Sequence, residues 1–299
     1  MFPTVPDQHK NGTPLVPNGL GVLYVLFAIV YLFLLYFFGI GRSSAFGDIS
    51  APLTLAVCIL FGGFMGLLDD WMDLKWRYKA FMPLIAALPL IYFAKHMLVR
   101  TSITLPFIGV LQFGEWYFYL IIPLIVMIVT NTINMLGGFN GLESVCPAIV
   151  LLGLMGISAL AAPSYYLLMI GPIIFWLILG ALNLRGKIFV GNSGSFAIGM
   201  TIASFAIIAD VKLGLLISLV PYIFNSSLIL LMVFFTRKKA LITFKDNKLE
   251  SDHKRSLVTL ITYRRPLTER QIVTIVSIIV AAFTLLAFIY SFISIIILG

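Results

Sequence analysis

Charged residues are scarce in this chain of 299 residues, where Asp, Glu, Lys and Arg together make up 11%. Soluble globular domains carry about 25% charged residues and about 50% apolar residues. Here 61% of the residues are hydrophobic and the mean hydropathy is +1.06, a balance that excludes a soluble domain. The chain is therefore predicted to be an integral membrane protein.

Cysteine and histidine are also rare. Cys58 and Cys146 both fall in apolar runs, so neither a disulfide framework nor a cysteine-based zinc site is expected. The three histidines, at positions 9, 96 and 253, are far apart in the sequence, which argues against a histidine metal cluster. The first 18 residues lack the basic-then-apolar order of a signal peptide, so we expect the mature chain to begin near Met1.

Long apolar runs are what the sequence has in abundance. Their length approaches the roughly 20 residues that a helix needs to cross a hydrocarbon core of about 30 Å. The runs are too many for a monotopic anchor. They are also too continuous for an outer-membrane barrel. The pattern predicts an all-α polytopic bundle in a single domain, 1–299. About nine spans are expected, at 19–39, 50–68, 80–98, 116–136, 143–161, 163–183, 194–209, 213–235 and 271–297.

Lysine and arginine are unevenly distributed between the two sides that such spans define. With the N-terminus inside, sixteen of these residues fall in inner segments and four, Arg42, Lys95, Arg100 and Lys212, in outer ones. Because translocation of these cations is costly, they stay on the cytoplasmic side of short loops. We therefore expect a cytoplasmic N-terminus, an external C-terminus and a location in the cell (plasma) membrane.

The outer and inner segments differ in character. The outer segment from Val99 to Glu115 alternates apolar and polar residues around Pro106 and Gly109, which predicts a short hairpin. The inner segments hold the conspicuous polar motifs, near 69–79, 137–142, 184–193 and 236–270. All candidate site residues are therefore expected on one membrane face.

The first inner motif is GLLDDWMDLKWRYK, which places Asp69 and Asp70 side by side at the end of a span. Adjacent carboxylates repel each other and are useful where a cation or a proton acceptor is wanted, and Lys79 could then face a bound phosphate. The alternative is a solvated helix end with Trp71 and Trp76 as interfacial anchors.

The second motif, NTINMLGGFNGLE, gathers three asparagines and three glycines around a helix end. Asn131 and Asn134, three residues apart, can share a helix face and offer amide oxygens to a hard cation. The glycines would let the backbone approach a flat or phosphate-bearing ligand, although small residues also mediate helix packing in membranes.

The third and fourth motifs add a helix N-terminus and positive charge. A Gly-Asn-Ser-Gly-Ser run, 191–195, opens a predicted helix whose N–H groups favour phosphate, although no Walker A pattern is present. The segment 236–270 carries ten basic and four acidic residues. One interpretation of this charge is a positive-inside loop attracted to anionic lipid heads, and the other is binding of a pyrophosphate. Nucleic-acid binding is not expected, because these two account for the charge.

Together these four segments suggest handling of a phosphorylated, metal-bound, water-soluble substrate beside the lipid. A transporter would more naturally keep polar groups near the midplane of broken helices, where these spans hold little that ionises. A non-catalytic lipid-phosphate carrier or flippase is the alternative from a different class.

The ordered motifs resemble those of the polyprenyl-phosphate N-acetylhexosamine-1-phosphate transferases, glycosyltransferase family 4. They are most similar to the archaeal and eukaryotic dolichyl-phosphate GlcNAc-1-phosphotransferases. The resemblance is carried by DQHKNGTPLVPNGLGV, GLLDDWMDLKWRYK, NTINMLGGFNGLE, FVGNSGSFAIGM and the stretch from KDNKLE to PLTER. It implies transfer of GlcNAc-1-phosphate from UDP-GlcNAc to a polyprenyl or dolichyl phosphate, with release of UMP, dependence on Mg²⁺ or Mn²⁺, and a possible homodimer.

The resemblance also implies roles for individual residues, position by position. The implied catalytic residues are Asp69, Asp70 and Lys79; the implied substrate-binding residues are Asn140, Phe189, Arg237 and Lys238; and the implied metal ligands are Asn134 and Asn192. A related enzyme acting on another UDP-sugar, such as a cell-wall precursor, is the nearer alternative.

Three features depart from the family pattern. Gly191-Asn192 stands where relatives usually have Gly-Asp, and a neutral amide holds Mg²⁺ less strongly than a carboxylate. Thr236-Arg237-Lys238-Lys239 replaces the histidine-bearing basic motif of many relatives. Relatives also usually have a further span before the position of Asp7.

Overall fold

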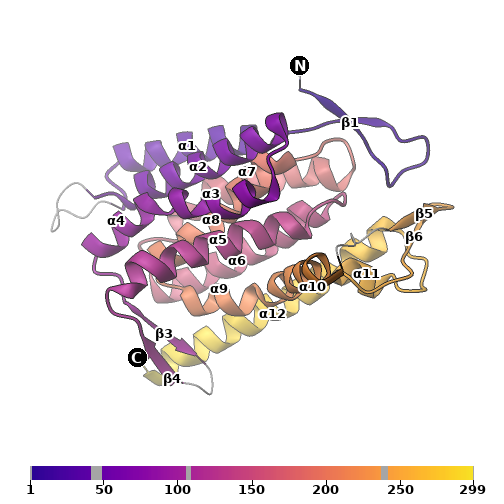
Figure 1. Ribbon diagram of the computed structural model, residues 1–299. Helices are drawn as coiled ribbons and strands as arrows, with labels where there is room; N and C mark the ends of the chain where they lie inside the picture. The colour runs from indigo at the N-terminus through magenta and orange to yellow at the C-terminus, as the bar shows by residue number, and fades with distance from the viewer. Residues whose placement is uncertain (1, 42–48, 106–108, 237–241, 299) are drawn as a thin grey trace.

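The computed structural model describes residues 2–41, 49–105, 109–236 and 242–298, and within these ranges it is a bundle of helices with three small hairpins (Figure 1). The helices are α1 (Gly21–Phe37), α2 (Ala51–Met72), α3 (Trp76–Ala86), α4 (Leu88–His96), the π-helical turn η1 (Tyr117–Ile121), α5 (Ile122–Leu136), α6 (Leu142–Ala161), α7 (Leu167–Leu184), α8 (Gly191–Ile208), α9 (Lys212–Ser218), α10 (Val220–Thr236), α11 (Leu257–Ile261) and α12 (Glu269–Leu298).

The strands form three separate antiparallel pairs. These are β1 (Thr4–Pro6) with β2 (Leu15–Pro17), β3 (Ser102–Leu105) with β4 (Gly109–Gln112), and β5 (Thr243–Lys245) with β6 (Lys248–Glu250). The hairpin expected between Val99 and Glu115 is confirmed, with Ser102 paired to Gln112. Figure 1 shows β3–β4 at one end of the bundle, with β1–β2 and β5–β6 at the other.

The apolar segments are helical, as expected, but fewer than nine are single membrane-length helices. Within the described ranges, six helices are long and apolar enough to cross a membrane: α2, η1 with α5, α6, α7, α8 and α12. The pair α9 and α10, bent by 54°, would make a seventh. The structure therefore supports a multi-helix membrane protein, with six or seven spans by length and composition.

The two remaining apolar segments fall short for identifiable reasons. Helix α1 has 17 residues, which corresponds to about 26 Å at 1.5 Å per residue. The expected span at 80–98 is divided into α3 and α4 at Ala87. Pro89 has no N–H to donate to the carbonyl four residues earlier, so a continuous helix is interrupted there.

Helix α8 lies at the centre of the bundle, with 89% of its residues buried inside the protein. It packs closely on α2 because Gly62 and Gly66 present no side chain to it. A β-carbon at Gly66 would lie 2.1 Å from the carbonyl oxygen of Asn192, and one at Gly62 would lie 2.8 Å from that of Phe196. Small residues four apart allow such backbone-to-backbone contact between membrane helices. The contact sets the end of α2 beside the beginning of α8.

Candidate functional site

Asp69, at the end of α2, is buried and only 3% exposed. Its Oδ1 accepts a hydrogen bond from the Leu74 N–H at 3.1 Å and lies 2.7 Å from Lys79 Nζ on α3. Its Oδ2 is buried and has no hydrogen-bond partner among the residues that the structure describes. A carboxylate oxygen removed from water without a partner is costly, so this atom is suited to a cation or a donor brought by a ligand.

Asp70 points in a different direction, toward α8. Its Oδ1 accepts the N–H of Asn192 at 2.9 Å and its Oδ2 accepts the N–H of Ser193 at 3.0 Å. These N–H groups belong to the first turn of α8, where the helix dipole favours negative charge. Gly191 has φ +71, and a β-carbon there would lie 2.8 Å from Asp70 Oδ2, so this approach requires glycine.

The asparagines of α5 divide between two tasks. The Oδ1 of Asn134 accepts a hydrogen bond from the Ser195 hydroxyl at 2.7 Å, which brings it to the first turn of α8. Asn131 instead donates to the carbonyl oxygens of Ala80, at 3.1 Å, and Met127, at 2.8 Å. Asn131 therefore joins α5 to α3, while Asn134 contacts Ser195 in α8, the helix whose N-terminus Asp70 caps.

Asn140 lies in a buried polar cluster between the N-terminal hairpin and α12. Its Nδ2 donates to Asp7 Oδ2 at 2.8 Å and to Glu269 Oε1 at 3.1 Å, and its backbone N–H donates to Glu269 Oε1 at 2.8 Å. Lys10 Nζ lies 3.1 Å from the same Asp7 oxygen. Asn140 Oδ1 is buried without a partner among the described residues, so it too is available to a ligand.

The cluster shifts the pKa of two groups on the hairpin loop. Burial acts to raise the pKa of Asp7, but hydrogen bonds from Asn140, Lys10 and the His9 N–H, with the charge of Lys10, hold it below its ordinary value of 3.8. Burial lowers the pKa of His9 below 6.5 against the opposing charges of Glu269 and Asp7. The His9 ring stacks on Phe139, with centroids 4.5 Å apart.

Asn183, at the end of α7, connects two of the predicted loops and is fully buried. Its Oδ1 accepts hydrogen bonds from the Gly141 N–H and the Ser144 hydroxyl, both at 2.8 Å. Its Nδ2 donates to Glu143 Oε1 at 3.2 Å and to the Ile188 carbonyl oxygen at 3.0 Å. The glycine turn after α5 and the segment leading into α8 are thus held by one amide.

Phe189 is half-buried and is fixed through its backbone. Its N–H donates to the Pro17 carbonyl oxygen at 2.8 Å, and its own carbonyl oxygen accepts the Leu20 N–H at 3.3 Å. This contact attaches β2 to the approach of α8. Arg237 and Lys238, which the sequence proposes as substrate-binding residues, lie outside the described residues.

Comparison with known proteins assigns the chain to a family. The family model of glycosyl transferase family 4 matches residues 52–210, more than half of the chain. The chain belongs to this family. The matched region includes Asp69, Asp70, Lys79 and the candidate residues up to Asn192, whereas Arg237 and Lys238 lie beyond it.

Several curated proteins are also similar to this chain over much of its length. The putative UDP-N-acetylglucosamine–dolichyl-phosphate N-acetylglucosaminephosphotransferase of Sulfolobus acidocaldarius is 30% identical over 218 residues, 72% of this chain and 64% of the relative. The enzyme of that name from Schizosaccharomyces pombe is 30% identical over 202 residues, 60% of this chain and 45% of the relative. The phospho-N-acetylmuramoyl-pentapeptide-transferase of Oceanobacillus iheyensis is 27% identical over 225 residues, 70% and 65% of the two chains.

The chain thus spans less than two thirds of the length of these curated relatives. The structure brings together the ends of α2 and α5 and the beginning of α8, which carry Asp69, Asp70, Asn134 and Asn192. It places Asn140 in a neighbouring cluster whose other members, Asp7 and Glu269, the sequence analysis assigned no role. Asp7 lies in DQHKNGTPLVPNGLGV, the first motif that carries the family resemblance, and this motif was the sequence feature that could have indicated a role for Asp7.

The residues at the ends of α2, α5 and α8 fit a hard divalent cation. Among the described residues, no three His, Cys, Asp or Glu side chains form a metal-binding group. Two carboxylates nevertheless lie beside the beginning of α8, to which the Asn134 amide and the Asn192 backbone also belong by contact, and Asp69 Oδ2 is buried without a partner among the described residues. Mg²⁺ is commonly bound through one or two carboxylates, with water and substrate phosphate completing its coordination. Asp69, through its unpartnered Oδ2, would hold the ion together with the amide oxygens of Asn134 and Asn192, while both Asp70 oxygens are engaged by the first turn of α8.

Proposed function

We propose that this chain transfers GlcNAc-1-phosphate from UDP-GlcNAc to a polyprenyl or dolichyl phosphate, forming a GlcNAc-diphospho-lipid and releasing UMP. This would be the first lipid-linked step of N-glycan assembly. The carrying observation is the Asp69–Asp70 pair at the end of α2, where Asp69 lies beside Lys79 and Asp70 contacts the N-terminus of α8. The names of the archaeal and fungal relatives support the choice of sugar and acceptor.

The chemistry requires two anionic substrates to be brought together. An oxygen of the lipid phosphate attacks the sugar-linked phosphorus of UDP-GlcNAc, and the bond from that phosphorus to the bridging oxygen breaks as UMP leaves. A phosphate monoester has a second pKa of about 6, so the nucleophile is largely dianionic at neutral pH without a strong base. Charge neutralisation and in-line placement are therefore the main requirements.

The proposed roles follow from the position of each side chain. Asp69, whose Oδ2 is unpartnered, orients the lipid phosphate or accepts its residual proton, and Lys79 beside it faces the substrate phosphates. Asp70 holds the first turn of α8 in place. Bound Mg²⁺ or Mn²⁺, near Asn134 and Asn192, would neutralise phosphate charge.

Recognition of the donor is proposed for the neighbouring cluster. Asn140, with its free Oδ1, would hydrogen-bond uridine, and Phe189 would stack on uracil. Arg237 and Lys238 would hold the pyrophosphate. The fit of Asn140 to uridine depends on the N-terminal hairpin, because Asp7 fixes its amide nitrogen at 2.8 Å.

The membrane arrangement is part of the proposal. We infer a single membrane-embedded domain with nine crossings, in which α1, the α3–α4 pair and the α9–α10 pair each traverse the bilayer in addition to the six long helices. The N-terminus and the active site would face the cytoplasm and the C-terminus the exterior of the plasma membrane, as the distribution of Lys and Arg favours. The protein would work alone or as a homodimer, without nucleic acid.

The deciding experiment is UMP release by purified protein supplied with UDP-GlcNAc, Mg²⁺ and a polyprenyl phosphate. We expect release that depends on the lipid and is abolished by Asp69→Asn, with UDP-GalNAc and UDP-glucose as competing donors. UDP-MurNAc-pentapeptide tests the second candidate, because a transferase of that name is 27% identical to this chain. Lipid-phosphate binding without UMP release from any donor would instead establish a non-catalytic carrier.

A further inference from the structure

A second polar pocket lies at the end of the bundle opposite the Asp69–Asp70 site. Three helices connect the two regions. Helix α8 begins at the Asp70 contact and ends just before Asp210, which lines the pocket. Helix α6 ends at Ala161, and α12 carries Ser291 and Ser294 near its C-terminal end, and all three residues also line the pocket. The 18 residues of α8 correspond to about 27 Å, close to the thickness of a hydrocarbon core. With α8 spanning the bilayer, as inferred above, the pocket would lie at the other membrane surface.

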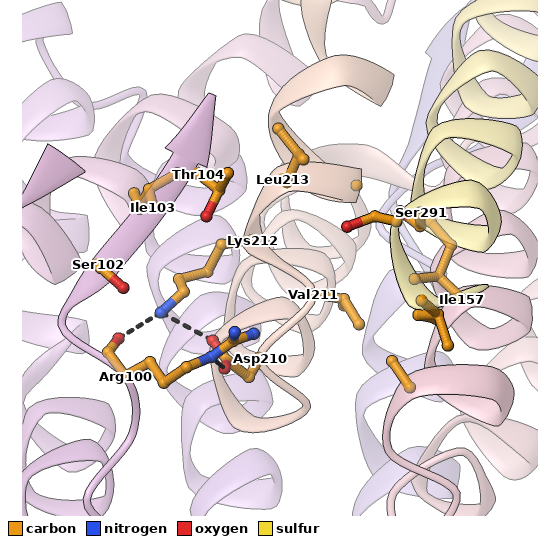
Figure 2. A pocket seen from close by; sticks show the side chains of 14 residues that line it. Arg100, Ser102, Ile103, Thr104, Ile157, Asp210, Val211, Lys212, Leu213 and Ser291 are labelled. Carbon is orange, nitrogen blue, oxygen red and sulfur yellow. Dashed lines mark hydrogen bonds and ion pairs between the residues drawn. The ribbon is translucent and has the colours of Figure 1, made fainter. Parts of the chain in front are cut away.

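The pocket has a volume of about 140 Å³, well above the roughly 10–15 Å³ that a single water molecule needs in this measure. Its polar wall is formed by two cations, one carboxylate and four hydroxyl groups: Arg100, Lys212, Asp210, Ser102, Thr104, Ser291 and Ser294. Its apolar wall comes from α6, α9 and α12 and includes Ile157, Leu213 and Ile295. Figure 2 shows the Arg100 guanidinium beside Asp210, with Ser291 on the opposite side of the pocket.

Charge in this pocket is unbalanced toward positive. Lys212, 4% exposed, pairs with Asp210 at 2.7 Å, donates to the Arg100 carbonyl oxygen and lies 4.5 Å from the centre of the Tyr117 ring. Lys212 and Asp210 thus neutralise each other. The charge of Arg100 is additional, and its side chain is 73% exposed. Its contact with Asp210 uses Nε, and the four further N–H donors of the guanidinium have no partner among the residues that the structure describes.

We propose that this pocket binds a phosphate group, as carried by the headgroup of an anionic phospholipid at this membrane surface. A guanidinium with free N–H donors matches phosphate oxygens in a bidentate arrangement, and the hydroxyls of Ser291 and Thr104 can donate to the same group. The adjoining wall of Ile157 and Ile295 suits the first carbons of an acyl chain. The occupant would attach the β3–β4 hairpin to α9 and α12.

The test is native mass spectrometry of the purified full-length protein with phosphatidylglycerol and phosphatidylcholine of identical acyl chains. We expect retention of phosphatidylglycerol in preference to phosphatidylcholine, weakened about tenfold in Arg100→Gln. Ser291→Leu, which fills the pocket without changing charge, is expected to weaken it similarly. Lys95→Gln is the matched control, because Lys95 is an exposed cation of the same surface that pairs with Glu115 and Tyr119 outside the pocket.

Millimolar inorganic phosphate, added alone and in competition, distinguishes the source of the group. Displacement of the lipid by phosphate would support the phosphate site and show that a soluble ligand can occupy it. Equal retention of phosphatidylglycerol by Arg100→Gln, Ser291→Leu and Lys95→Gln would overturn the proposal. Because the readout is lipid binding, neither result depends on transferase activity.

Discussion

The Asp70 carboxylate accepts a hydrogen bond of 2.9 Å from the backbone N–H of Asn192, so the end of α2 caps the beginning of α8. Two helices separated by more than 100 residues therefore form one unit at the site. This contact gives the second Asp of the pair a positioning task that is distinct from that of the first. A substitution at either helix end is therefore expected to displace the other end as well.

We predict that Asp70→Asn lowers stability as well as activity. The amide keeps one acceptor oxygen, but its NH₂ group faces the N–H donors of α8 and the negative charge at the helix N-terminus is removed. Together these changes lower the free energy of unfolding by about 1 kcal/mol. The measurement is thermal unfolding alongside UMP release. Asp73→Asn is the control, because that side chain is fully exposed, and equal melting temperatures for the two variants would contradict the capping role.

Lys79→Met is predicted to be strongly destabilising because it leaves Asp69 buried without its cation. Removing one partner of a buried ion pair costs about 3 kcal/mol or more, reduced here because the Lys79 side chain is 27% exposed. Asp69→Asn combined with Lys79→Met should recover part of this loss. A double variant no more stable than Lys79→Met would show that the pair is not coupled, and Arg77→Gln, an exposed neighbour, serves as control.

Gly66→Ala is predicted to separate α2 from α8. The added methyl would lie 2.1 Å from the Asn192 carbonyl oxygen, and overpacking of this kind costs about 1–3 kcal/mol. Gly180→Ala is the matched control, because the nearest atom to its new methyl is 3.4 Å away. Both variants can be compared by thermal unfolding in the same detergent. Comparable stability would mean that α2 and α8 tolerate a wider separation than the structure has.

Asn183→Ala is predicted to raise the KM for UDP-GlcNAc more than it lowers kcat. The variant leaves the Gly141 N–H and the Ile188 carbonyl oxygen without their partner. Each group that stays unsatisfied lowers the free energy of unfolding by about 1–3 kcal/mol. The loops carrying Asn140 and Phe189 would lose their common support. Ser158→Ala removes one hydrogen bond at the far end of α6 and should leave both constants unchanged.

Docking of the N-terminal hairpin is predicted to weaken as the pH falls below 6.5. The folded-state pKa of His9 is lowered from 6.5, so between the two values the unfolded chain binds more protons and stability rises with pH. The stability that the neutral, buried His9 contributes is complete above pH 6.5 and is lost as the pH falls toward the folded-state pKa. His9→Phe can keep the stack on Phe139 without titrating, so its melting temperature should depend less on pH. Parallel pH profiles would exclude His9 as the cause.

Much of the fold could be predicted from sequence because a bilayer leaves the backbone few alternatives. Apolar runs predicted the helical segments, and alternation around Pro106 and Gly109 predicted the β3–β4 hairpin. Which apolar segments are continuous helices could not be predicted, because hydropathy does not register the break at Ala87 or the 54° bend between α9 and α10. Those depend on backbone hydrogen bonding and on packing.

The sequence by itself determined the membrane class, the motifs and the family, since composition and residue order are sufficient for each. Tertiary structure decided how the paired aspartates divide: Asp69 turns to Lys79 and Asp70 to the first turn of α8. It also brought Asp7 and Glu269 to Asn140 from positions 133 and 129 residues away. Contacts over such distances depend on close helix packing, as at Gly66, and local sequence carries no measure of which surfaces meet.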